Sequence, residues 1–295
     1  MVHLIDASVF VFRAWYSIPP DMLDPAHNPV NALYGFSRFL GDFLEELQPQ
    51  RVAVAFDENR GADCVRTAIY PAYKANREPA PPGLKQQFAR CREVTRALGL
   101  AGHADSAFEA DDLIAALAAR AHAAGERVTI LSRDKDLAQL LQPGDVLWDY
   151  PSGRRIAHED VPQVYGVRAE QIADFLALTG DAVDNIPGVR GVGPKTAAAL
   201  LGHFADLDEI YANLAAVARL KIRAAPALAE RLRRQRGEAE LALRLTRLRR
   251  DAPLPAGPAA LQRRRPDLEG LDALYDQAGF GEALRRQARR LATRG

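Results

Sequence analysis

Val2-His3-Leu4-Ile5-Asp6 is an apolar run that ends in an aspartate. Arg51-Val52-Ala53-Val54-Ala55-Phe56-Asp57 repeats this pattern, and Arg127-Val128-Thr129-Ile130-Leu131-Ser132 is a third apolar run. Short β-branched or apolar runs with polar residues at their ends are typical of buried strands. Apolar residues at helical spacing fill 30–47, 84–98 and 109–124. Strands that alternate with helices predict an α/β fold whose central sheet is mostly parallel and flanked by helices.

Residues 58–83 interrupt this alternation. The segment mixes polar and aromatic residues and ends in several prolines. It is too polar for a buried element and longer than an ordinary connection, which indicates a functional or disordered segment. After residue 158 the pattern is helical throughout, with a proline-rich break from Pro253 to Pro258 and a last helix from about Asp267. The sequence therefore predicts an α/β part over 1–158 and a helical part over 159–295.

Composition excludes several classes of protein. The 295 residues are 48% hydrophobic and 26% charged, as in globular proteins. No run of 18 apolar residues and no charged-then-apolar leader is present, so we expect neither a membrane span nor a signal peptide. The only cysteines, Cys64 and Cys91, exclude a disulfide framework and a four-cysteine zinc site. The expected location is the cytoplasm.

The net charge of +1 conceals a strong asymmetry along the chain. Residues 219–265 contain 14 basic and 4 acidic residues, so the remainder of the chain is net negative. This basic segment is equally well explained by a solvated arginine-rich face or by a surface that binds a phosphate backbone.

Aspartates end two of the predicted strands and closely follow the third. Asp6 and Asp57 are the last residues of the first two, and Ser132-Arg133-Asp134-Lys135-Asp136 follows the third. Ligands of open α/β sheets bind at the carboxyl ends of the strands, so these acids are candidates for one site. Each aspartate taken alone is also a common helix cap or turn former.

Two further acidic clusters share one spacing. Glu109-Ala110-Asp111-Asp112 precedes a predicted helix, where acids also suit the helix dipole, and Asp181-Ala182-Val183-Asp184 follows Thr179-Gly180. So many carboxylates near one sheet edge would repel one another unless cations lay among them, and oxygen ligands select Mg²⁺ or Mn²⁺. Two such ions suit phosphodiester hydrolysis. The candidate ligands are Asp6, Asp57, Glu109, Asp111, Asp112, Asp134, Asp136, Asp181 and Asp184.

The stretch Gly188-Val189-Arg190-Gly191-Val192-Gly193-Pro194-Lys195-Thr196 is rich in glycine. It is not a nucleotide P-loop, because Pro194 stands where that motif needs glycine and no strand precedes it. We interpret it as two short helices joined by Gly-Val-Gly. Backbone amides there, at the start of a helix near Pro194, can hold a DNA phosphate without reading sequence. An ordinary helix–helix turn is the alternative.

These stretches together resemble the 5′ nuclease family, which includes flap endonucleases, phage 5′ exonucleases and the N-terminal 5′→3′ exonuclease domain of bacterial DNA polymerase I. The resemblance runs in family order over nearly the whole chain, and the EADD and TGDxxDNIPGVxGxGPKTA signatures are its most specific parts. The matching stretches are Leu4-Ile5-Asp6, Tyr34-Gly35-Phe36, Ala55-Phe56-Asp57, Tyr73-Lys74-Ala75-Asn76-Arg77, Glu109-Ala110-Asp111-Asp112, Asp134-Lys135-Asp136, Thr179-Gly180-Asp181, Asp184-Asn185-Ile186-Pro187-Gly188, Lys195-Thr196-Ala197, Arg264-Arg265-Pro266-Asp267 and Gly279-Phe280-Gly281.

The resemblance implies a PIN-like core, a helical arch at about 58–85, a helix–two-turn–helix element at about 184–202 and a tail that packs back on the core. It implies that Asp6, Asp57, Glu109 and Asp111 lie nearest one ion. Asp134, Asp136, Asp181 and Asp184 would line a second, looser region, with Asp112 between the two.

The resemblance also implies roles for basic and aromatic residues. Lys74 would contact the scissile phosphate from the arch, and Tyr73 would stack on a base. Arg13, Arg66 and Arg77 would handle phosphates of the frayed strand. The duplex-binding residues would be Gly188, Gly191, Gly193, Lys195 and Thr196, and the same motif tends to bind K⁺ through backbone carbonyls in this family.

Two residues depart from the family pattern. Val65 stands where an aromatic usually precedes the arch arginine, and Arg133 replaces a small residue. Neither is a metal ligand, so they put arch contacts and rate in question but not the reaction class. The sequence continues into no polymerase region, and we expect a stand-alone enzyme.

We therefore predict a structure-selective 5′ nuclease that uses two Mg²⁺ or Mn²⁺ ions to hydrolyse DNA and leave 5′-phosphates, in replication and repair. Its expected partner is flapped, nicked or branched DNA; we expect a monomer with no membrane or required protein partner. One alternative is a catalytically weak flap- or junction-binding protein. Another is a PIN-type nuclease directed at RNA.

Overall fold

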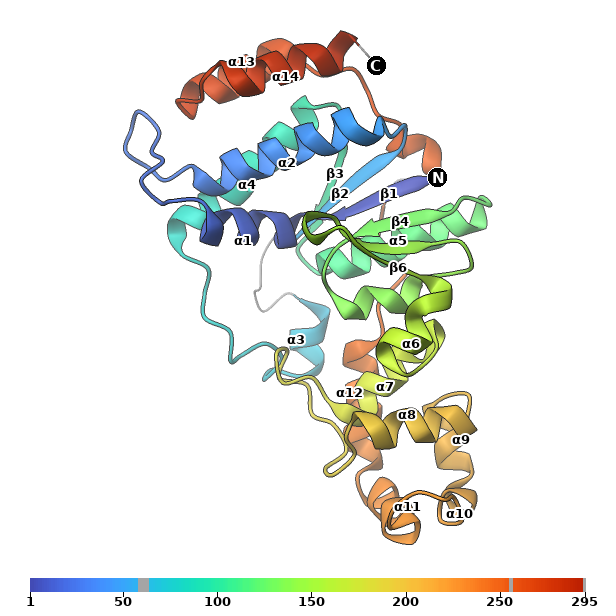
Figure 1. Ribbon diagram of the computed structural model, residues 1–295. Coiled ribbons are helices and arrows are strands. Elements are labelled where there is room, and N and C mark those ends of the chain that lie inside the picture. The colour runs from blue at the N-terminus through green and yellow to red at the C-terminus, as the bar shows by residue number, and fades with distance from the viewer. Residues whose placement is uncertain (58–63, 255–256, 294–295) are drawn as a thin grey trace. The chain divides into compact units, whose positions relative to one another are not determined.

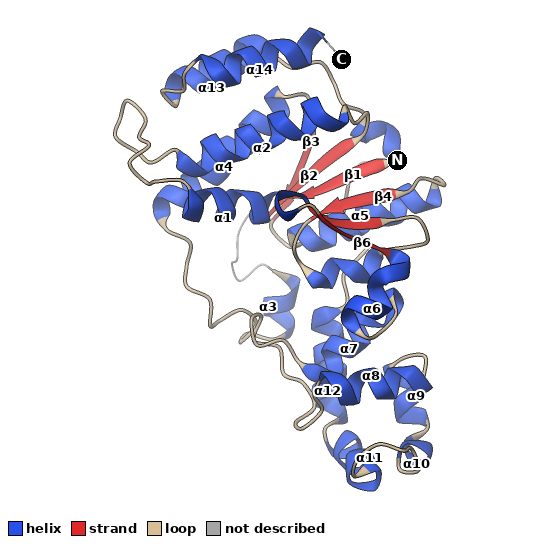
Figure 2. Ribbon diagram, in the orientation of Figure 1, coloured by secondary structure: helices blue, strands red, loops and turns tan. Residues whose placement is uncertain are grey.

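The computed structural model describes residues 1–57, 64–254 and 257–293. The chain forms two compact units (Figures 1 and 2). The first unit contains 1–60, 79–133 and 250–295, and the second contains 61–78 and 134–249. The units are interleaved along the chain, so the predicted boundary at residue 158 falls inside the second unit. The predicted arch, at 58–85, lies partly outside the described residues, as do Gly61–Asp63 beside Val65.

Four parallel strands form the centre of the first unit, in the order β3-β2-β1-β4. Every residue of β1 and β4 is buried, as is β2 up to its final aspartate, and this explains their almost unbroken apolar sequences. The predicted strands at 2–6, 51–57 and 127–132 are thereby confirmed. The strands are β1 (Val2–Asp6), β2 (Val52–Asp57), β3 (Ala101–Asp105) and β4 (Val128–Leu131).

Strand β3 was not predicted. Its sequence, Ala-Gly-His-Ala-Asp, has small and polar residues and no β-branched residue. It pairs with β2 through a parallel ladder that runs from Ala53–Ala101 to Asp57–Asp105, and it is only partly buried. An edge strand of this kind is held by its backbone hydrogen bonds more than by burial of its side chains, so it lacks the hydrophobic pattern by which strands are recognised.

Helices cover both faces of these four strands (Figure 1). Helix α5 packs on one face, while α1, α2 and α4 lie on the other. Ring contacts fix α2 to the strands, with centroids 5.9 Å apart for Phe36 and Phe56 and 5.6 Å apart for His3 and Phe43. The helices predicted at 30–47, 84–98 and 109–124 are confirmed. Their bounds, with that of α1, are α1 (Ala7–Ser17), α2 (Asn31–Leu47), α4 (Pro82–Ala97) and α5 (Ala110–Ala123).

The C-terminal helices form an outer layer of the first unit. Helix α13 (Leu268–Gln277) packs on α4, and α14 (Glu282–Thr293) packs on α2. Gln287 of α14 donates to Asp42 of α2 over 2.8 Å. A short 3₁₀ helix, η5 (Pro258–Leu261), precedes them. The predicted final helical piece from about Asp267 is confirmed, but it consists of two helices separated by residues 278–281.

The second unit combines one antiparallel hairpin with short helices. The hairpin, β5 (Val146–Asp149) and β6 (Arg154–Ala157), was missed because its strands have four residues each and carry no clear alternation. In the described residues after 158 no further strand occurs, which confirms the helical prediction. The helical elements are α3 (Val65–Ile69), η1 (Lys135–Leu140), η2 (Tyr150–Ser152), η3 (His158–Asp160), α6 (Val161–Tyr165), η4 (Ala169–Gln171), α7 (Ile172–Thr179), α8 (Pro194–His203), α9 (Leu207–Ala212), α10 (Leu214–Val217), α11 (Ala225–Arg234) and α12 (Arg236–Thr246).

The glycine-rich stretch differs in one respect from the prediction. A helix, α8, follows the glycines as expected, but no helix lies directly before them. The preceding helix, α7, ends at Thr179, and residues 180–193 form turns with an isolated bridge between Asp181 and Ile186. Pro187 and the close packing of Gly188, described below, disfavour a helix there. The mostly parallel α/β fold class is confirmed.

None of the helices in the described part of the chain is both long and apolar enough to cross a membrane.

Candidate metal and nucleic-acid site

Asp6 and Asp57 are joined through one serine at the carboxyl ends of β1 and β2. The backbone amide of Ser8 donates to Asp6 over 3.0 Å, and the Ser8 hydroxyl donates to Asp57 over 2.7 Å. Ser132, directly after β4, donates to the other oxygen of Asp6 over 2.9 Å. The two aspartates are thus held on neighbouring strand ends, as predicted. Ser8 and Ser132 were not predicted as site residues, although both lie within two residues of a strand end.

The N-terminus of α5 adds three more of the predicted carboxylates. Glu109 is the N-cap residue, and its backbone amide donates to Asp112 over 3.3 Å in a reciprocal capping box. The next amide, of Ala110, donates to Asp57 over 2.9 Å. The positive end of the helix dipole therefore faces Asp57 and its neighbours. Asp112 is only 1% exposed and has a capping role, whereas Asp111 is half-buried in the first turn.

Asp134 and Asp136 form a second acidic group, in the second unit. Asp134 caps η1 and accepts a hydrogen bond from the amide of Asp136 over 2.9 Å. One carboxylate oxygen of Asp136, Oδ1, is buried without a hydrogen-bond partner. Burial, followed by the negative charge of Asp134, raises the pKa of Asp136 to about 7. Such a carboxylate needs a cation beside it to remain ionised at low cost.

Lys135 supplies part of this positive charge. Its ammonium group lies 2.7 Å from Asp181 Oδ2 and 3.8 Å from Asp136 Oδ1. Burial lowers the pKa of Lys135, but the bond to Asp181 and the charges of the other aspartates outweigh it and raise the pKa overall. Burial likewise acts to raise the pKa of Asp181, and Lys135 reverses that effect, so that its pKa is lowered. The Lys135–Asp181 pair is therefore ionised.

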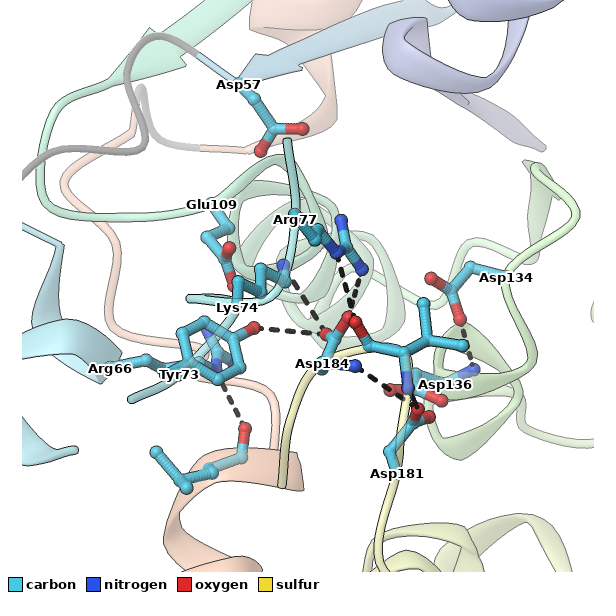
Figure 3. A network of polar contacts seen from close by, with 12 residues as sticks. Asp57, Arg66, Tyr73, Lys74, Arg77, Glu109, Asp134, Asp136, Asp181 and Asp184 are labelled. Carbon is cyan, nitrogen blue, oxygen red and sulfur yellow. Dashed lines mark hydrogen bonds and ion pairs between the residues drawn. The ribbon is translucent and has the colours of Figure 1, made fainter. Parts of the chain in front are cut away.

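The Asp184 carboxylate contacts three residues that were predicted to contact DNA (Figure 3). Lys74 Nζ lies 3.5 Å from Asp184 Oδ2, and the Tyr73 hydroxyl donates to the same oxygen over 3.3 Å. The Arg77 guanidinium pairs with Asp184 Oδ1. Tyr73 is 7% exposed, so its ring lies inside the second unit in this structure. The structure thus brings together Lys74, Arg77 and one of the predicted metal ligands.

Arg66 and Arg13 lie in contrasting places. Arg66 is 4% exposed, and its Nε donates to the carbonyl of Leu245 at the end of α12 over 2.7 Å (Figure 3). This contact ties α3 to α12, a packing role that the sequence does not reveal. Arg13 is exposed on α1, in the first unit.

Gly188 is needed for a close approach of the backbone. A Cβ on Gly188 would lie 2.3 Å from the amide nitrogen of Gly180 and 2.4 Å from the carbonyl carbon of Thr179. Gly193 differs, because a Cβ there would meet nothing within 4 Å. Gly193 is the N-cap of α8, followed by Pro194 in the first turn. The amide end of α8 is therefore accessible, and the Lys195 side chain is exposed beside it.

Gly191 is held by α11. Its φ of 77° is in the left-handed region, and its carbonyl accepts from the Arg231 guanidinium over 3.1 Å. The carbonyls of Val189 and Gly193 accept from amides of Val192 and Thr196. Three carbonyl oxygens of this loop thus accept hydrogen bonds, and the K⁺ site that the resemblance implies stays a prediction.

The carboxylates do fit divalent metal binding in their chemistry. The candidates offer only oxygen donors, and Asp136 Oδ1 is buried with no donor to satisfy it. Among the described residues, however, no three acidic, histidine or cysteine side chains lie close enough together to hold an ion. Five candidates, Asp6, Asp57, Glu109, Asp111 and Asp112, belong to the first unit, and Asp134, Asp136, Asp181 and Asp184 belong to the second.

Two known proteins are similar to this chain in sequence. A 5′-3′ exonuclease of Aquifex aeolicus is 34% identical over 270 residues, which cover 92% of this chain and 89% of that protein. DNA polymerase I of Rhizobium leguminosarum is 40% identical over 260 residues, which cover 86% of this chain but 25% of the polymerase. The chain thus spans about a quarter of that polymerase's length.

A solved structure shows the same fold. The bacteriophage T5 flap endonuclease, in a complex with DNA and metal ions, matches with a TM-score of 0.65 and 18% identity, covering 99% of this chain and 98% of its own.

Two family descriptions match nearly the whole chain. Residues 1–166 match the 5′-3′ exonuclease N-terminal resolvase-like domain, and residues 167–269 match the 5′-3′ exonuclease C-terminal SAM fold. The strand ends with their aspartates and the glycine-rich turn before α8 fall within these two matches. The chain belongs to the 5′-3′ exonuclease family, a family of nucleases.

Proposed function

We propose that the chain is a structure-selective 5′ nuclease, which hydrolyses phosphodiesters of flapped, nicked or branched DNA and leaves 5′-phosphates. The observation that carries the proposal is the joint placement of Lys74 and Arg77 on Asp184, beside the ion pair of Lys135 and Asp181. Cationic side chains and a set of hard oxygen ligands are the two components that phosphoryl chemistry requires. A place in DNA replication or repair follows from such a substrate.

The metal-binding part of the proposal rests on two groups of carboxylates, one in each unit. Mg²⁺ or Mn²⁺ ions held by them would stabilise negative charge on the phosphate and lower the pKa of an attacking water. Asp6 and Asp57 are fixed for this role by Ser8, and Asp57 is fixed also by the first turn of α5. Rigid carboxylates of this kind bind an ion without having to be ordered first.

Lys74 and Arg77 are proposed to act on the substrate phosphate. Both pair with Asp184, which keeps two cations ordered at one point. A phosphodiester that reaches this point replaces the carboxylate as their partner, because guanidinium and ammonium groups bind phosphate oxygens by charge-assisted hydrogen bonds. Tyr73 then becomes available for stacking on a base when its hydroxyl leaves Asp184.

Duplex DNA is proposed to bind at the N-terminus of α8 and along α11 and α12. The amide end of α8 suits a phosphate, and Lys195 adds a nearby positive charge. The last turn of α11 contains Arg231, Arg233 and Arg234. Some of this charge is already compensated, since Arg233 pairs with Glu230 and Arg236 with Glu240. Contacts of this kind bind the backbone without reading the sequence, so affinity should fall steeply with salt.

Cleavage of a 5′-labelled flap duplex tests the proposal. The matched substrates are a single strand of the same sequence and an RNA flap, each incubated with Mg²⁺, Mn²⁺ or EDTA. Metal-dependent cutting near the DNA flap junction, abolished by EDTA, is the expected result. Flap binding without cutting would favour a catalytically weak clamp, and a preference for the RNA flap would favour a PIN-type RNA nuclease.

A further inference from the structure

Several hydrogen bonds to backbone carbonyls join two segments of the second unit. The loop 72–77 carries Lys74 and Arg77, and the turn 181–185 carries Asp181 and Asp184. The amide of Lys74 donates to the carbonyl of Asp184 over 2.9 Å. These two segments are 104 or more residues apart in sequence, so their pairing is a tertiary contact and not a local turn.

Two asparagine side chains add hydrogen bonds between the two segments. Asn185 Nδ2 donates to the carbonyl of Ala72 over 2.6 Å, and Asn76 Nδ2 donates to the carbonyl of Ala182 over 3.0 Å. Each side chain reaches across to the backbone of the other segment, and the two bonds run in opposite directions. Together with the Lys74 amide they fix the loop at three points along its length.

The backbone conformation at this contact is uncommon. Lys74 and Asn185 both have a φ of 54°, in the left-handed region that residues other than glycine, asparagine and aspartate rarely adopt. Such a conformation persists only where the surroundings fix it. Three hydrogen bonds fix Lys74. Its backbone amide donates to the Asp184 carbonyl, and the side chains of Asn76 and Asn185 donate to backbone carbonyls on either side of this bond. The conformation sets the direction in which the Lys74 side chain leaves the backbone.

We propose that Asn76 and Asn185 are positioning residues, which clamp loop 72–77 to turn 181–185 so that Lys74 and Arg77 are directed at Asp184 and at the substrate phosphate that replaces it. The proposal rests on the proposed nuclease function for its kinetic consequence but not for its structural one. Neither asparagine carries a charge, and each donates to a backbone carbonyl, so neither is assigned to metal or phosphate.

Hydrogen exchange tests the clamp in the metal-free, DNA-free protein. The variant Asn185→Gly removes the amide donor and keeps the left-handed backbone accessible, because glycine adopts a positive φ without strain. Asn76→Ala removes the opposite donor at an exposed position, where misfolding is not expected. In both variants we expect the Lys74 amide to exchange at least about tenfold faster than in the wild type, since its partner is no longer held in place.

The matched control is Asn213→Ala. Asn213 also donates from Nδ2 to a backbone carbonyl, that of Glu209, over 2.9 Å, but at the end of α9. Its loss should leave exchange of the Lys74 amide unchanged. Wild-type exchange at Lys74 in both clamp variants would overturn the proposal whether or not the protein cleaves DNA.

Single-turnover cleavage and metal titration test the consequence for the reaction. Misplacing a reactive group by about 1 Å can cost roughly a hundredfold in rate, so Asn185→Gly should slow the single turnover by about ten- to a hundredfold. Binding of Mn²⁺ alone and affinity for the flap duplex should stay at wild-type values. A variant that loses Mn²⁺ binding instead would make Asn185 part of the metal site and would contradict the positioning role.

A double-mutant cycle separates this inference from a failure of the proposed function. If Asn185 acts through Lys74, then Asn185→Gly should cost little in a Lys74→Ala background, because the two residues share one effect. Full additivity of the two rate losses would overturn the proposal. A wild-type protein that cuts no flap at all would contradict the nuclease function and leave the hydrogen-exchange result to decide the clamp.

Discussion

Gly188 lies against Gly180 so closely that a Cβ on Gly188 would approach the Gly180 amide nitrogen to 2.3 Å. Gly188→Ala should therefore destabilise the second unit by about 1–3 kcal/mol, the usual range for overpacking. Gly193→Ala is the contrasting change, because a Cβ there meets nothing within 4 Å. We expect its melting temperature to match the wild type and its affinity for duplex DNA to fall. Thermal melting and duplex titration of the two variants check both expectations; equal melting temperatures would contradict the packing role of Gly188.

Asp57→Asn should abolish cleavage and spare the fold. Asparagine keeps an oxygen that can accept from the Ala110 amide, and the Ser8 hydroxyl can turn to accept from the new amide group. What is lost is the negative charge that a divalent ion requires. We expect flap cleavage to fall by roughly a hundredfold or more, about 3 kcal/mol of barrier, with duplex affinity largely retained.

The control for Asp57→Asn is Asp105→Asn, at the end of the edge strand β3. Asp105 accepts from the amides of Ala107 and Phe108 and is not among the predicted ligands. Cleavage at the wild-type rate by Asp57→Asn would remove that residue from the metal site.

Asp136→Asn should stabilise the metal-free protein at alkaline pH. The pKa of Asp136 is raised from 3.8 to about 7 in the folded state, so the folded protein binds more protons between these values than the unfolded chain. Stability of the wild type should fall as pH rises from about 4 to about 7, and this loss should be absent in the variant.

Denaturant unfolding of the wild type and of Asp136→Asn, in EDTA at several pH values, measures this difference in the pH dependence of stability. Mg²⁺ should raise the melting temperature of the wild type at pH 8 and have a smaller effect on the variant, because ligand binding stabilises only the state that binds it. A wild type and a variant with parallel pH profiles would show that the burial of Asp136 carries no such cost.

Arg66 and Arg77 should respond differently to truncation. Arg66→Ala leaves the Leu245 carbonyl without its guanidinium donor and removes a buried side chain, so we expect a loss of about 1–3 kcal/mol of stability. Arg77→Ala removes a partly exposed partner of Asp184 and should leave the melting temperature near that of the wild type. Its defect should appear in the rate of a single turnover, as should that of Lys74→Ala. A reversed pattern, with Arg77→Ala unstable and Arg66→Ala slow, would exchange the two roles.

Much of the first unit was predictable from hydrophobic pattern alone. β1, β2 and β4 are buried along almost their whole length, and such strands have to be apolar at successive positions. The edge strand β3 and the hairpin β5–β6 carry no comparable pattern, since backbone pairing stabilises them without continuous burial. The serines that hold Asp6 and Asp57 also escaped prediction, because a hydroxyl in a strand-end turn is too common to be informative by itself.

The candidate site was predictable in its residue types but not in its pairings. The acids could be recognised from their positions at strand ends and helix starts, whereas the partners of Asp184 come from a segment more than a hundred residues away. Only the folded chain shows that Lys74 and Arg77 meet that carboxylate. Arg66 illustrates the opposite case, because an arginine in a polar segment gives no sign that its guanidinium will be buried.

The interleaving of the two units has a consequence for the order of events during protein synthesis. The strands of the first unit are complete once residue 131 has left the ribosome, yet α13 and α14, which pack on α4 and α2, are made more than 130 residues later. Until then the outer surfaces of these two early helices lack their partners and expose apolar side chains, a condition that favours association with chaperones. The unit that starts to fold first is therefore the one that is finished last.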